Sequence, residues 1–480
     1  MNVIPRSFKE PIEKTIFLAQ QFTDAGYNIY LVGGSVRDGF VGRPAKNSHT
    51  GAESSEKVDI DLTTDASPDE IERVLNGFAD VVWPQGKQFG TIGAIYNGQK
   101  FEITTHRSEA YSADSRHPRV VFGNDIKTDL ARRDFTVNAM AIKLPEILLV
   151  DPFGGLEDLL ENKILKTPID PRESFSDDPL RMLRAARFSC GYNLTPTQDL
   201  IEAVKAMPER LKIVSAERVR DEFNILLTLP DPQLGLWFIV KNGLADIFLP
   251  ELPALSLEQD PIHKHKDVLS HTMAVVAKTS SDLVLRLAAL LHDIGKPKTR
   301  SISNNGVSFH HHDIVGAKMA RKRLEAMRYS NEQIEQVTTL IALHLRFHTY
   351  QMGWTDSAIR RYARDAGDLL DKLNAVTRAD CTTRNMSKAK ALMARMDEFE
   401  SRYLELKAKE ELGAIRPELD GLEVMRALDI PPGPVVGKAL AYLLEIRLDE
   451  GLIGKEEITA RLRSWYLEYK NDQHKSDIVT

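Results

Sequence analysis

A glycine turn near the start of the chain has the residue types that bind phosphate. The stretch YLVGGSVRDGF places a short apolar run, residues 30–32, before Gly33 and Gly34. Such a run predicts a buried strand. A turn that opens a helix after a strand exposes backbone N–H groups to an anion. Arg37 adds a planar, forked cation suited to phosphate. The turn therefore predicts a phosphate site, although glycine pairs also form plain turns.

Two carboxylates follow this turn in the sequence VDIDLTT. Asp59 and Asp61 flank Ile60. Alternate residues of a strand share a face, so both carboxylates are expected to point one way while Ile60 points into the core. Hard oxygen ligands beside a phosphate site suit Mg²⁺. A D-x-D alone is more often a solvated strand end, but together with the glycine turn it predicts metal-assisted phosphoryl or nucleotidyl transfer.

Histidine and aspartate gather in a second part of the chain. Nine of the thirteen histidines lie between His263 and His348. A lone histidine is most often structural, whereas a His-Asp pair, His292-Asp293, with several more histidines nearby is a different pattern. Imidazole plus carboxylate is a mixed ligand set for divalent metals. Such a metal can activate water for phosphoester hydrolysis.

The elements around the first site predict a head of mixed strands and helices. Apolar periodicity and turn residues predict helices over 7–26 and 68–79, and strands over 91–96 and 101–105. The polar stretch 42–57 reads as a surface loop inserted between the turn and the carboxylates. Glu102, on the second strand, is either a third carboxylate near the metal or an exposed strand residue. A turn-rich stretch, 107–131, then leads to Arg133 and to Asp134, which could cap a helix.

Most of the remaining chain reads as helical. The segment 174–192 carries a basic stripe at three-residue spacing, made of Arg181, Arg184 and Arg187, after Asp177 and Asp178. By spacing alone this is a solvated, salt-bridged face. In 215–223, Arg218 and Glu222 have the i,i+4 spacing of a helix-stabilising pair.

Bulk composition excludes several classes of protein. A length of 480 residues predicts two to four domains, and a net charge of −6 argues against a globally basic nucleic-acid coat protein. The two cysteines, Cys190 and Cys381, offer neither a disulfide framework nor a Cys-type zinc site, which indicates a reducing cytoplasm. The first twenty residues lack the long apolar core of a signal peptide or membrane span.

Taken in order, GG-x-VRD, D-x-D, RRD-x-T and DDPLRMLRAARF resemble the motifs of the tRNA nucleotidyltransferase/poly(A) polymerase family. The resemblance implies that Asp59 and Asp61 are the catalytic carboxylates and hold Mg²⁺. It implies that Gly34, Arg37 and Arg133 bind the triphosphate and that Asp134 binds the ribose. It further implies that Asp178 and Arg181 read the base. In the same way it implies that Arg184 and Arg187 help to bind the nucleotide. Asp177 stands where the family usually has Glu.

An Asp/Arg pair offers the base both acceptors and forked donors. Cytosine and adenine each show an amino donor beside a ring-nitrogen acceptor, whereas uracil and guanine have the opposite polarity. The pair Asp178 and Arg181 therefore gives a physical account of choosing C and A without a nucleic-acid template.

The histidine-rich part is similar to HD-type phosphohydrolase domains. The similarity implies His271, His292, Asp293 and Asp380 as the core ligands of a second divalent metal, Mn²⁺, Ni²⁺ or Mg²⁺. His312 and His344 match further histidines of that pattern.

The motifs together imply an α+β chain with a polymerase-β-like nucleotidyltransferase head, followed by largely helical parts. The expected division is a head (1–160), a helical neck that selects the base and binds RNA (161–255), an HD-type domain (256–385) and a helical tail (386–480). The resemblance is to class II bacterial CCA tRNA nucleotidyltransferases with a fused HD domain, of an actinobacterial type.

The expected activity is Mg²⁺-dependent addition of C, C and A to the tRNA 3′ end from CTP and ATP in the cytoplasm, with no membrane or DNA partner. The rivals are a poly(A) polymerase, an enzyme that adds only CC or only A, and, from another class, an HD phosphohydrolase acting on nucleotides or RNA ends.

Overall fold

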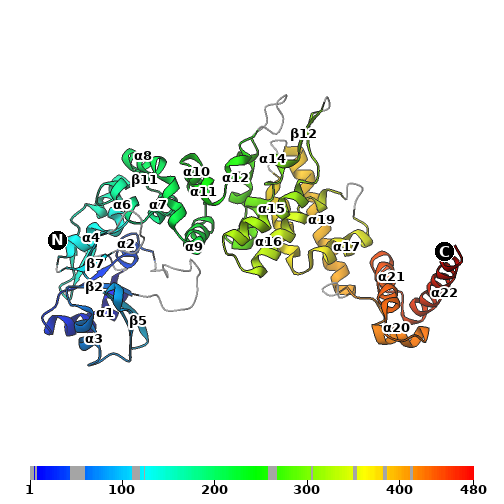
Figure 1. Cartoon of the computed structure of the whole chain (residues 1–480), viewed down its shortest axis with the longest axis horizontal. Helices are drawn as coiled ribbons and strands as arrows, with labels where there is room; N and C mark the ends of the chain where they lie inside the picture. Colours follow the sequence, from blue (N-terminus) through cyan, green and yellow to red (C-terminus); the bar gives the residue numbers. More distant parts are fainter. Residues whose placement is uncertain are drawn as a thin grey trace. The chain divides into compact units, whose positions relative to one another are not determined.

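The computed structural model describes most of the chain, which forms two compact units. The described residues are 5, 8–43, 60–110, 119–123, 125–257, 267–303, 306–349, 354–381, 386–410 and 415–479. The first unit comprises Met1–Ser256, Ser280–Arg286 and Lys322–Ser330, and the second comprises Leu257–Thr279, Leu287–Arg321 and Asn331–Thr480. Figure 1 shows the strands of the head and the helices that follow them, coloured along the chain. Each unit is described by itself.

A seven-stranded mixed sheet forms the base of the first unit, in the order β3-β4-β5-β2-β1-β8-β9. Its strands are β1 (Ile29–Val32), β2 (Ile60–Thr64), β3 (Val81–Gly86), β4 (Thr91–Tyr96), β5 (Gln99–Thr105), β8 (Ala141–Leu144) and β9 (Leu148–Val150). Strands β2 and β5 are parallel, and the other pairs are antiparallel. All four residues of β1 are buried, as expected of a central, apolar strand. The predicted small mixed sheet is confirmed.

Short helices and a hairpin surround this sheet. They are α1 (Lys9–Asp24), α2 (Gly34–Phe40), α3 (Pro68–Leu75), α4 (Ile126–Ala131), and the pair β6 (Arg107–Ala110) and β7 (Arg119–Phe122). Helix α3 starts at the predicted residue because Ser67 and Glu70 form a capping box and Pro68 occupies the first helical position. It ends at Leu75, earlier than expected. The insertion 42–57 lies largely outside the described residues.

Helices follow the head within the first unit. They are α6 (Pro171–Asp177), α7 (Leu180–Tyr192), α8 (Gln198–Ala206), α9 (Ala216–Leu227), α10 (Gln233–Lys241) and α11 (Ala245–Phe248). The predicted segment 174–192 is divided between α6 and α7, because the residue before a proline is disfavoured in a helix and Asp178 is extended before Pro179. The Asp178 carboxylate then accepts a hydrogen bond from the Leu180 amide at 3.1 Å and so starts α7.

Arg286 completes the first unit from a distant part of the sequence. It is 1% exposed, and its guanidinium donates to the carbonyl oxygens of Leu227, Leu229, Pro230 and Ser280. Helix α9 ends at Leu227, so Arg286 supplies donors to carbonyls at and just beyond a helix terminus, where no intrahelical partner exists.

The second unit is built almost entirely of helices. They are α12 (Val268–Lys278), α13 (Leu283–Leu291), α14 (Lys296–Thr299), α15 (His312–Ala326), α16 (Asn331–Leu343), α17 (Asp356–Ala366), α18 (Leu370–Asp380), α19 (Met386–Glu410), α20 (Gly421–Leu428), α21 (Pro434–Glu450) and α22 (Lys455–Val479), of which α13 and α15 extend into segments of the first unit. One hairpin, β12 (Arg300–Ser303) and β13 (Gly306–Phe309), lies between α14 and α15. Among the described residues, no helix combines the length and apolarity needed to cross a membrane.

Candidate functional site

The glycine turn, one predicted carboxylate and one predicted cation meet at Gly33. This residue has φ 71° and ψ −140°, in the region that favours glycine. A Cβ atom placed on it would lie 3.3 Å from Oδ2 of Asp61 and 3.6 Å from Nη1 of Arg133. Three motifs that are far apart in the sequence therefore share one small volume at the end of β1.

Asp61 has a second carboxylate beside it. Strands β2 and β5 are parallel and in register, with Asp61 opposite Glu102, so the two side chains project from the same face of the sheet. Glu102 is also 3.4 Å from the Lys100 ammonium, and its side chain is 39% exposed. Asp59 lies outside the described residues. The acidic edge beside the glycine turn thus contains at least Asp61 and Glu102, which is a donor set that fits a hard divalent cation.

Arg37 has a different set of contacts from the phosphate contact expected of it. Its guanidinium donates to both carboxylate oxygens of Asp38 at 2.9 Å and to Oδ1 of Asn138 at 2.6 Å. The residue is only 7% exposed. Its triphosphate role stays a prediction, and the contacts present make it part of a buried network beneath the turn.

Arg133 and its neighbour Arg132 share one buried counter-charge. Asp129 is fully buried and lies 3.0 Å from Arg132 Nη2 and 3.4 Å from Arg133 Nη2. Burial raises the pKa of Asp129, but the two guanidinium groups outweigh it and hold the pKa below its usual range. Asp129 thus orients both arginines while their side chains stay 20% exposed.

Asp134 connects the head to helix α7. Its Oδ2 lies 2.6 Å from Arg184 Nη2, and its Oδ1 accepts from the Asn138 amide at 2.8 Å. Burial raises the pKa of Asp134, but Arg184 and Asn138 together hold it well below its ordinary range. The predicted ribose carboxylate is therefore ion-paired with an arginine of the predicted nucleotide site.

Glu222 on α9 supports the basic stripe from the other side. It pairs with the Nε of Arg187 and lies 3.8 Å from Arg184. Arg218, the expected i,i+4 partner of Glu222, instead donates to Asp178 at 2.9 Å. Both side chains of α9 thus contact α7 or its cap, rather than forming the helix-internal pair that the spacing predicted.

The two predicted base-reading residues differ in exposure. Arg181 is 8% exposed and donates to the Ser174 hydroxyl at 2.8 Å and to the Arg132 carbonyl at 2.5 Å. The Asp178 side chain is 25% exposed, and that of Arg184 is 33% exposed. Of these residues, Asp178 and Arg184 have the greater access to a nucleotide.

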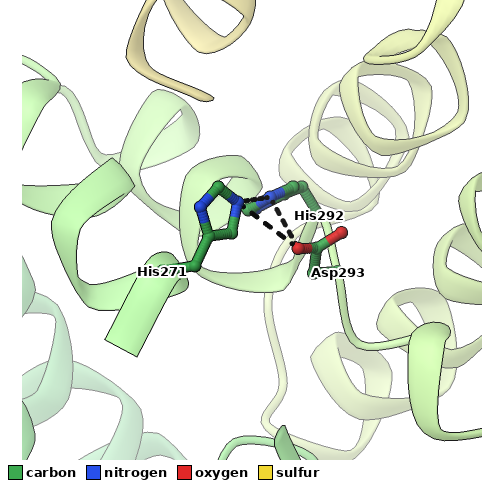
Figure 2. Close-up of side chains that lie close together, drawn as sticks. All are labelled: His271, His292 and Asp293. Atoms are coloured by element: carbon green, nitrogen blue, oxygen red, sulfur yellow. Dashed lines mark hydrogen bonds and ion pairs between the residues drawn. The ribbon is translucent and has the colours of Figure 1, made fainter. Parts of the chain in front are cut away.

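The second unit brings the four predicted HD ligands together. His271 lies on α12, His292 and Asp293 directly follow α13, and Asp380 ends α18. Figure 2 shows the first three converging, with His271 Nε2 3.3 Å from His292 Nε2 and 3.5 Å from Asp293 Oδ2. Asp380 Oδ1 lies 2.9 Å from His271 Nε2. Because these groups come from different helices, packing of the bundle assembles the cluster.

Asp293 also belongs to a second group of possible ligands. Asp293, His312 and His344 offer atoms that all lie within 4.8 Å of one another, as do His271, His292 and Asp293. His312 Nε2 is 3.4 Å from Asp293 Oδ1, whereas the first group is nearer Oδ2. The sequence pattern named His312 and His344 only as additional histidines, and the structure places both at the cluster.

Three of these histidines present the same ring nitrogen to the cluster. The Nδ1 atoms of His292, His312 and His344 lie 2.8, 2.7 and 2.6 Å from the carbonyl oxygens of Ala289, Phe309 and Ile341. A carbonyl only accepts, so each Nδ1 donates its proton, and Nε2 is the nitrogen that faces the cluster. The buried His344 Nε2 has no hydrogen-bond partner within the described residues. Nε2 atoms that face carboxylates in this way fit a metal centre.

The charges of the cluster favour a bound cation. Burial lowers the pKa of His292, but Asp293 and Asp380 outweigh it and raise that pKa to about 10. The pKa values of both carboxylates are correspondingly held well below the usual range, against the effect of burial. Burial, with His292 beside it, lowers the pKa of His344 to about 4, so this ring stays neutral. The two carboxylates with the neutral His344, and with His292 once a metal displaces its proton, form a donor set for a divalent metal.

Protein-family models match three parts of the chain. They are the poly A polymerase head domain at residues 29–165, a probable RNA- and SrmB-binding site of polymerase A at 193–255, and the HD domain at 268–385. The A-adding tRNA nucleotidyltransferase of Deinococcus radiodurans is 33% identical over 395 residues, covering 78% of this chain and 88% of that protein. This chain belongs to the tRNA nucleotidyltransferase/poly(A) polymerase family. The resemblance inferred from the motifs is confirmed, and with it the assignment as a nucleotidyltransferase.

Further relatives agree with this family. The CCA-adding enzyme of Geobacillus sp. (strain WCH70) is 37% identical over 245 residues, covering 51% of this chain and 56% of that enzyme. Among solved structures, the Bacillus stearothermophilus CCA-adding enzyme in complex with CTP has a TM-score of 0.70 at 21% identity, covering 97% of this chain and 99% of that one. The Thermotoga maritima CCA-adding enzyme complexed with tRNA has a TM-score of 0.58 at 19% identity, covering 95% and 96%. The predicted fold, a polymerase head followed by helices with an HD domain, is confirmed.

Proposed function

We propose that this nucleotidyltransferase adds C, C and A to the tRNA 3′ end from CTP and ATP, without a nucleic-acid template. The observation that carries the proposal is the meeting of Asp61 and Arg133 at Gly33, with helix α7 tied to the same loop through Asp134 and Arg184. Addition of A alone is the second candidate, because the relative covered over 88% of its length is an A-adding enzyme, whereas this chain spans 56% of the Geobacillus CCA-adding enzyme.

Asp59 and Asp61 would hold Mg²⁺ at the edge of the sheet, with Glu102 beside them. Bound there, Mg²⁺ would acidify the tRNA 3′-hydroxyl and stabilise charge on the α-phosphate and the pyrophosphate leaving group. The protein's own part is positioning. Arg133 faces the volume in front of Gly33 and is placed to contact the triphosphate.

The α7 side of the site would read the base. Asp178 presents an acceptor and the arginines of α7 present forked donors, which match the amino and ring-nitrogen groups of cytosine and adenine. The contacts of Arg181 with Ser174 and with the Arg132 carbonyl require it to change partners to touch a base. Arg184, at 33% exposure, needs less rearrangement.

The test offers the protein tRNA ending before C, after CC and after CCA, with each NTP separately, followed by sequencing of the 3′ ends. We expect C, C and A and then no further addition. A alone on CC ends would assign the A-adding reaction, a long A tail would assign a poly(A) polymerase, and CC without A would assign the shorter reaction. Asp61→Ala should abolish addition while the fold persists, and Asp80→Ala, an exposed carboxylate of the same unit, should leave it intact.

We also propose that the HD cluster holds a divalent metal, Mn²⁺, Ni²⁺ or Mg²⁺, and hydrolyses phosphoesters. The observation that favours it is the set of histidine Nε2 atoms that converge on Asp293 and Asp380. A divalent metal bound by His271, His292, Asp293 and Asp380 would activate water. Activity of this site should not depend on the head, because all its described ligands come from the second unit.

This second activity has its own test. Phosphate release from cyclic or 3′-phosphate RNA ends should survive Asp61→Ala and disappear in Asp293→Ala, with loss of bound metal measured by mass spectrometry. Asp368→Ala, an exposed carboxylate in the second unit, serves as the control. A folded wild-type protein in which mass spectrometry detects no bound metal would contradict the proposal.

The four-part division of the chain and its place in the cell also remain proposals. We place the head at 1–160, the neck at 161–255, the HD-type domain at 256–385 and the tail at 386–480. The two free cysteines, Cys190 and Cys381, support a cytoplasmic enzyme.

A further inference from the structure

A buried cluster joins the glycine-turn helix α2 to the last turns of α7. From the head it takes Arg37, Asp38 and Asn138, which are 7%, 6% and 6% exposed. From α7 it takes the rings of Phe188 and Tyr192, which stack on each other at 5.6 Å. The reaction proposed above assigns no role to the ring pair or to Asp38.

Asp38 is the bridge of this cluster. Its two carboxylate oxygens accept from Arg37, each at 2.9 Å. Oδ1 accepts in addition from the Tyr192 hydroxyl at 2.6 Å. Hydrogen bonds to a buried, charged acceptor are stronger than neutral ones. The Tyr192 hydroxyl therefore holds the Asp38–Arg37 pair from the α7 side.

Cations pack against the Tyr192 ring as well. The Arg37 guanidinium carbon is 4.4 Å from the ring centroid, and that of Arg43 is 4.8 Å away. Arg43 also donates to the Gly191 carbonyl at 2.9 Å. Cation–π contacts of this kind add to the hydrogen bond and depend on the ring rather than on the hydroxyl. Ring and hydroxyl can therefore be separated by mutation.

Several contacts join helix α7 to the head, among them Arg181 to the Arg132 carbonyl and Arg43 to the Gly191 carbonyl, and two more involve carboxylates of the head. The first is the pair of Asp134 and Arg184, and the second is the contact of Tyr192 with Asp38. The proposed site has one half in the head, at Gly33 and Asp61, and the other half on α7, near Asp178. The distance between the residues that contact the triphosphate and those that contact the base therefore depends on the Asp134–Arg184 ion pair and on the Tyr192–Asp38 hydrogen bond.

We propose that Tyr192 is a positioning residue for nucleotide transfer, whose hydroxyl fixes the glycine turn relative to the base-reading helix through Asp38 and Arg37. The inference rests on the nucleotide addition proposed above. A nucleotide whose base is held by α7 reacts only if its α-phosphate lies at the carboxylates of the head, and small errors in that alignment are costly in rate. Loss of the hydroxyl should therefore slow the chemical step and reduce the selectivity for the correct base, while the nucleotide still binds in the ground state.

The experiment compares wild type with Tyr192→Phe, which keeps the ring and its cation contacts and removes only the hydroxyl. We expect kcat for C addition to fall about tenfold, the effect of one lost hydrogen bond, with KM for CTP changed less than about twofold. The ratio of U to C incorporated should rise. Asp38→Asn should show the same pattern, and the double variant should be no worse than Asp38→Asn, because both act through one contact.

Tyr27→Phe is the matched control. Tyr27 also bonds a carboxylate of the first unit, Glu70, but at the head surface, so its removal should leave kcat and base choice unchanged. If the wild type adds nucleotides and Tyr192→Phe has the same kcat and the same ratio of U to C incorporated, the inference is wrong. An equal loss for all nucleotides that matches a loss of folded protein in thermal melts would also overturn it. A wild type that adds no nucleotide would overturn the proposed function and this inference together.

Discussion

At the scale of single residues, Gly33 shows why the turn needs glycine for two separate reasons. Its φ of 71° is strained for other residues. A methyl group there would also press on Asp61, at 3.3 Å, and make an ordinary van der Waals contact with Arg133, at 3.6 Å. The first reason concerns the stability of the turn, and the second concerns the space that a nucleotide phosphate would enter.

Gly33→Ala should therefore lose activity beyond its loss of stability. Gly26 is a matched control, because it has a φ of 89° but a methyl group added to it would meet no atom within 4 Å. We expect both variants to lose about 1–2 kcal/mol of stability, measured by urea unfolding, and only Gly33→Ala to lose most nucleotide addition. Equal activity of the two variants would argue against a phosphate site at Gly33.

The lowered pKa of Asp134 predicts how the stability of the fold depends on pH. Its folded-state pKa is held below the unfolded value, which is about 4. Its ion pair thus stabilises the fold fully above that pH, and the contribution is lost as pH falls further toward the folded pKa. Asp134→Asn should cost about 2 kcal/mol near neutral pH, discounted because Arg184 is partly exposed.

The gap between Asp134→Asn and wild type should then narrow in acid. Thermal melts from about pH 6 down to about pH 2 would follow it. A gap that stays constant over this range would show that Asp134 is not held ionised by Arg184.

At the scale of elements, α7 is the piece through which the head and the rest of the first unit act together. It contacts Asp134 through Arg184 and contacts Glu222 of α9 through Arg187. Such a helix has buried arginines whose charge must be balanced locally, because an unpaired buried charge is costly.

Glu222→Gln should therefore destabilise the first unit. Glu222 is 5% exposed and faces Arg184 and Arg187. Its loss leaves Arg187 without its counter-charge and leaves Arg184 with Asp134 alone, at a cost of about 3 kcal/mol. Glu217→Gln, an exposed glutamate of the same helix, should cost little. Urea unfolding of the two variants decides, and equal midpoints would contradict the argument.

Elements with a local signal were predictable from the sequence. The strand before Gly33, the capped start of α3 and the helical HD part follow from periodicity and capping residues. The ligand set of the HD cluster was predictable because the His-Asp pair is adjacent in sequence. Its completion by His312 and His344 needed the packing of helices.

Several contacts around the arginines were not predictable, because the partners are distant in sequence. Arg37 bonds Asn138, 101 residues away, and its partner Asp38 bonds Tyr192, 154 residues away. Residue type alone predicts that an arginine binds phosphate. Only the folded structure shows that the guanidinium of Arg37 already donates to a buried carboxylate. Spacing misled in the same way for Arg218 and Glu222, which contact α7 or its cap rather than each other.

At the scale of the whole molecule, the two compact units interleave along the chain. Residues 280–286 and 322–330 belong to the first unit, although they are surrounded by sequence of the second. Arg286 bonds the carbonyls after α9, and Tyr329 donates to Asn224 Oδ1 at 2.5 Å. A fragment ending at Ser256 therefore lacks part of its own unit.

Arg286→Met tests this dependence. The change leaves the buried carbonyl at 227 and the less buried carbonyls at 229 and 230 without this donor, so amide exchange in the last turn of α9 should accelerate. Hydrogen exchange followed by mass spectrometry measures it, with Lys298→Met at an exposed position as the control. Unchanged protection of α9 would show that Arg286 does not hold this terminus.

The place of Arg286 in the sequence also orders events during synthesis. Domains generally fold as units while the chain emerges from the ribosome, N-terminal part first. Here the carbonyls at the end of α9 have no contact with Arg286, and Asn224 has none with Tyr329, until those later residues have been synthesised. The first unit can close only after much of the histidine cluster has been made, so a nascent chain that stalls between these points would present an unfinished neck to chaperones and proteases.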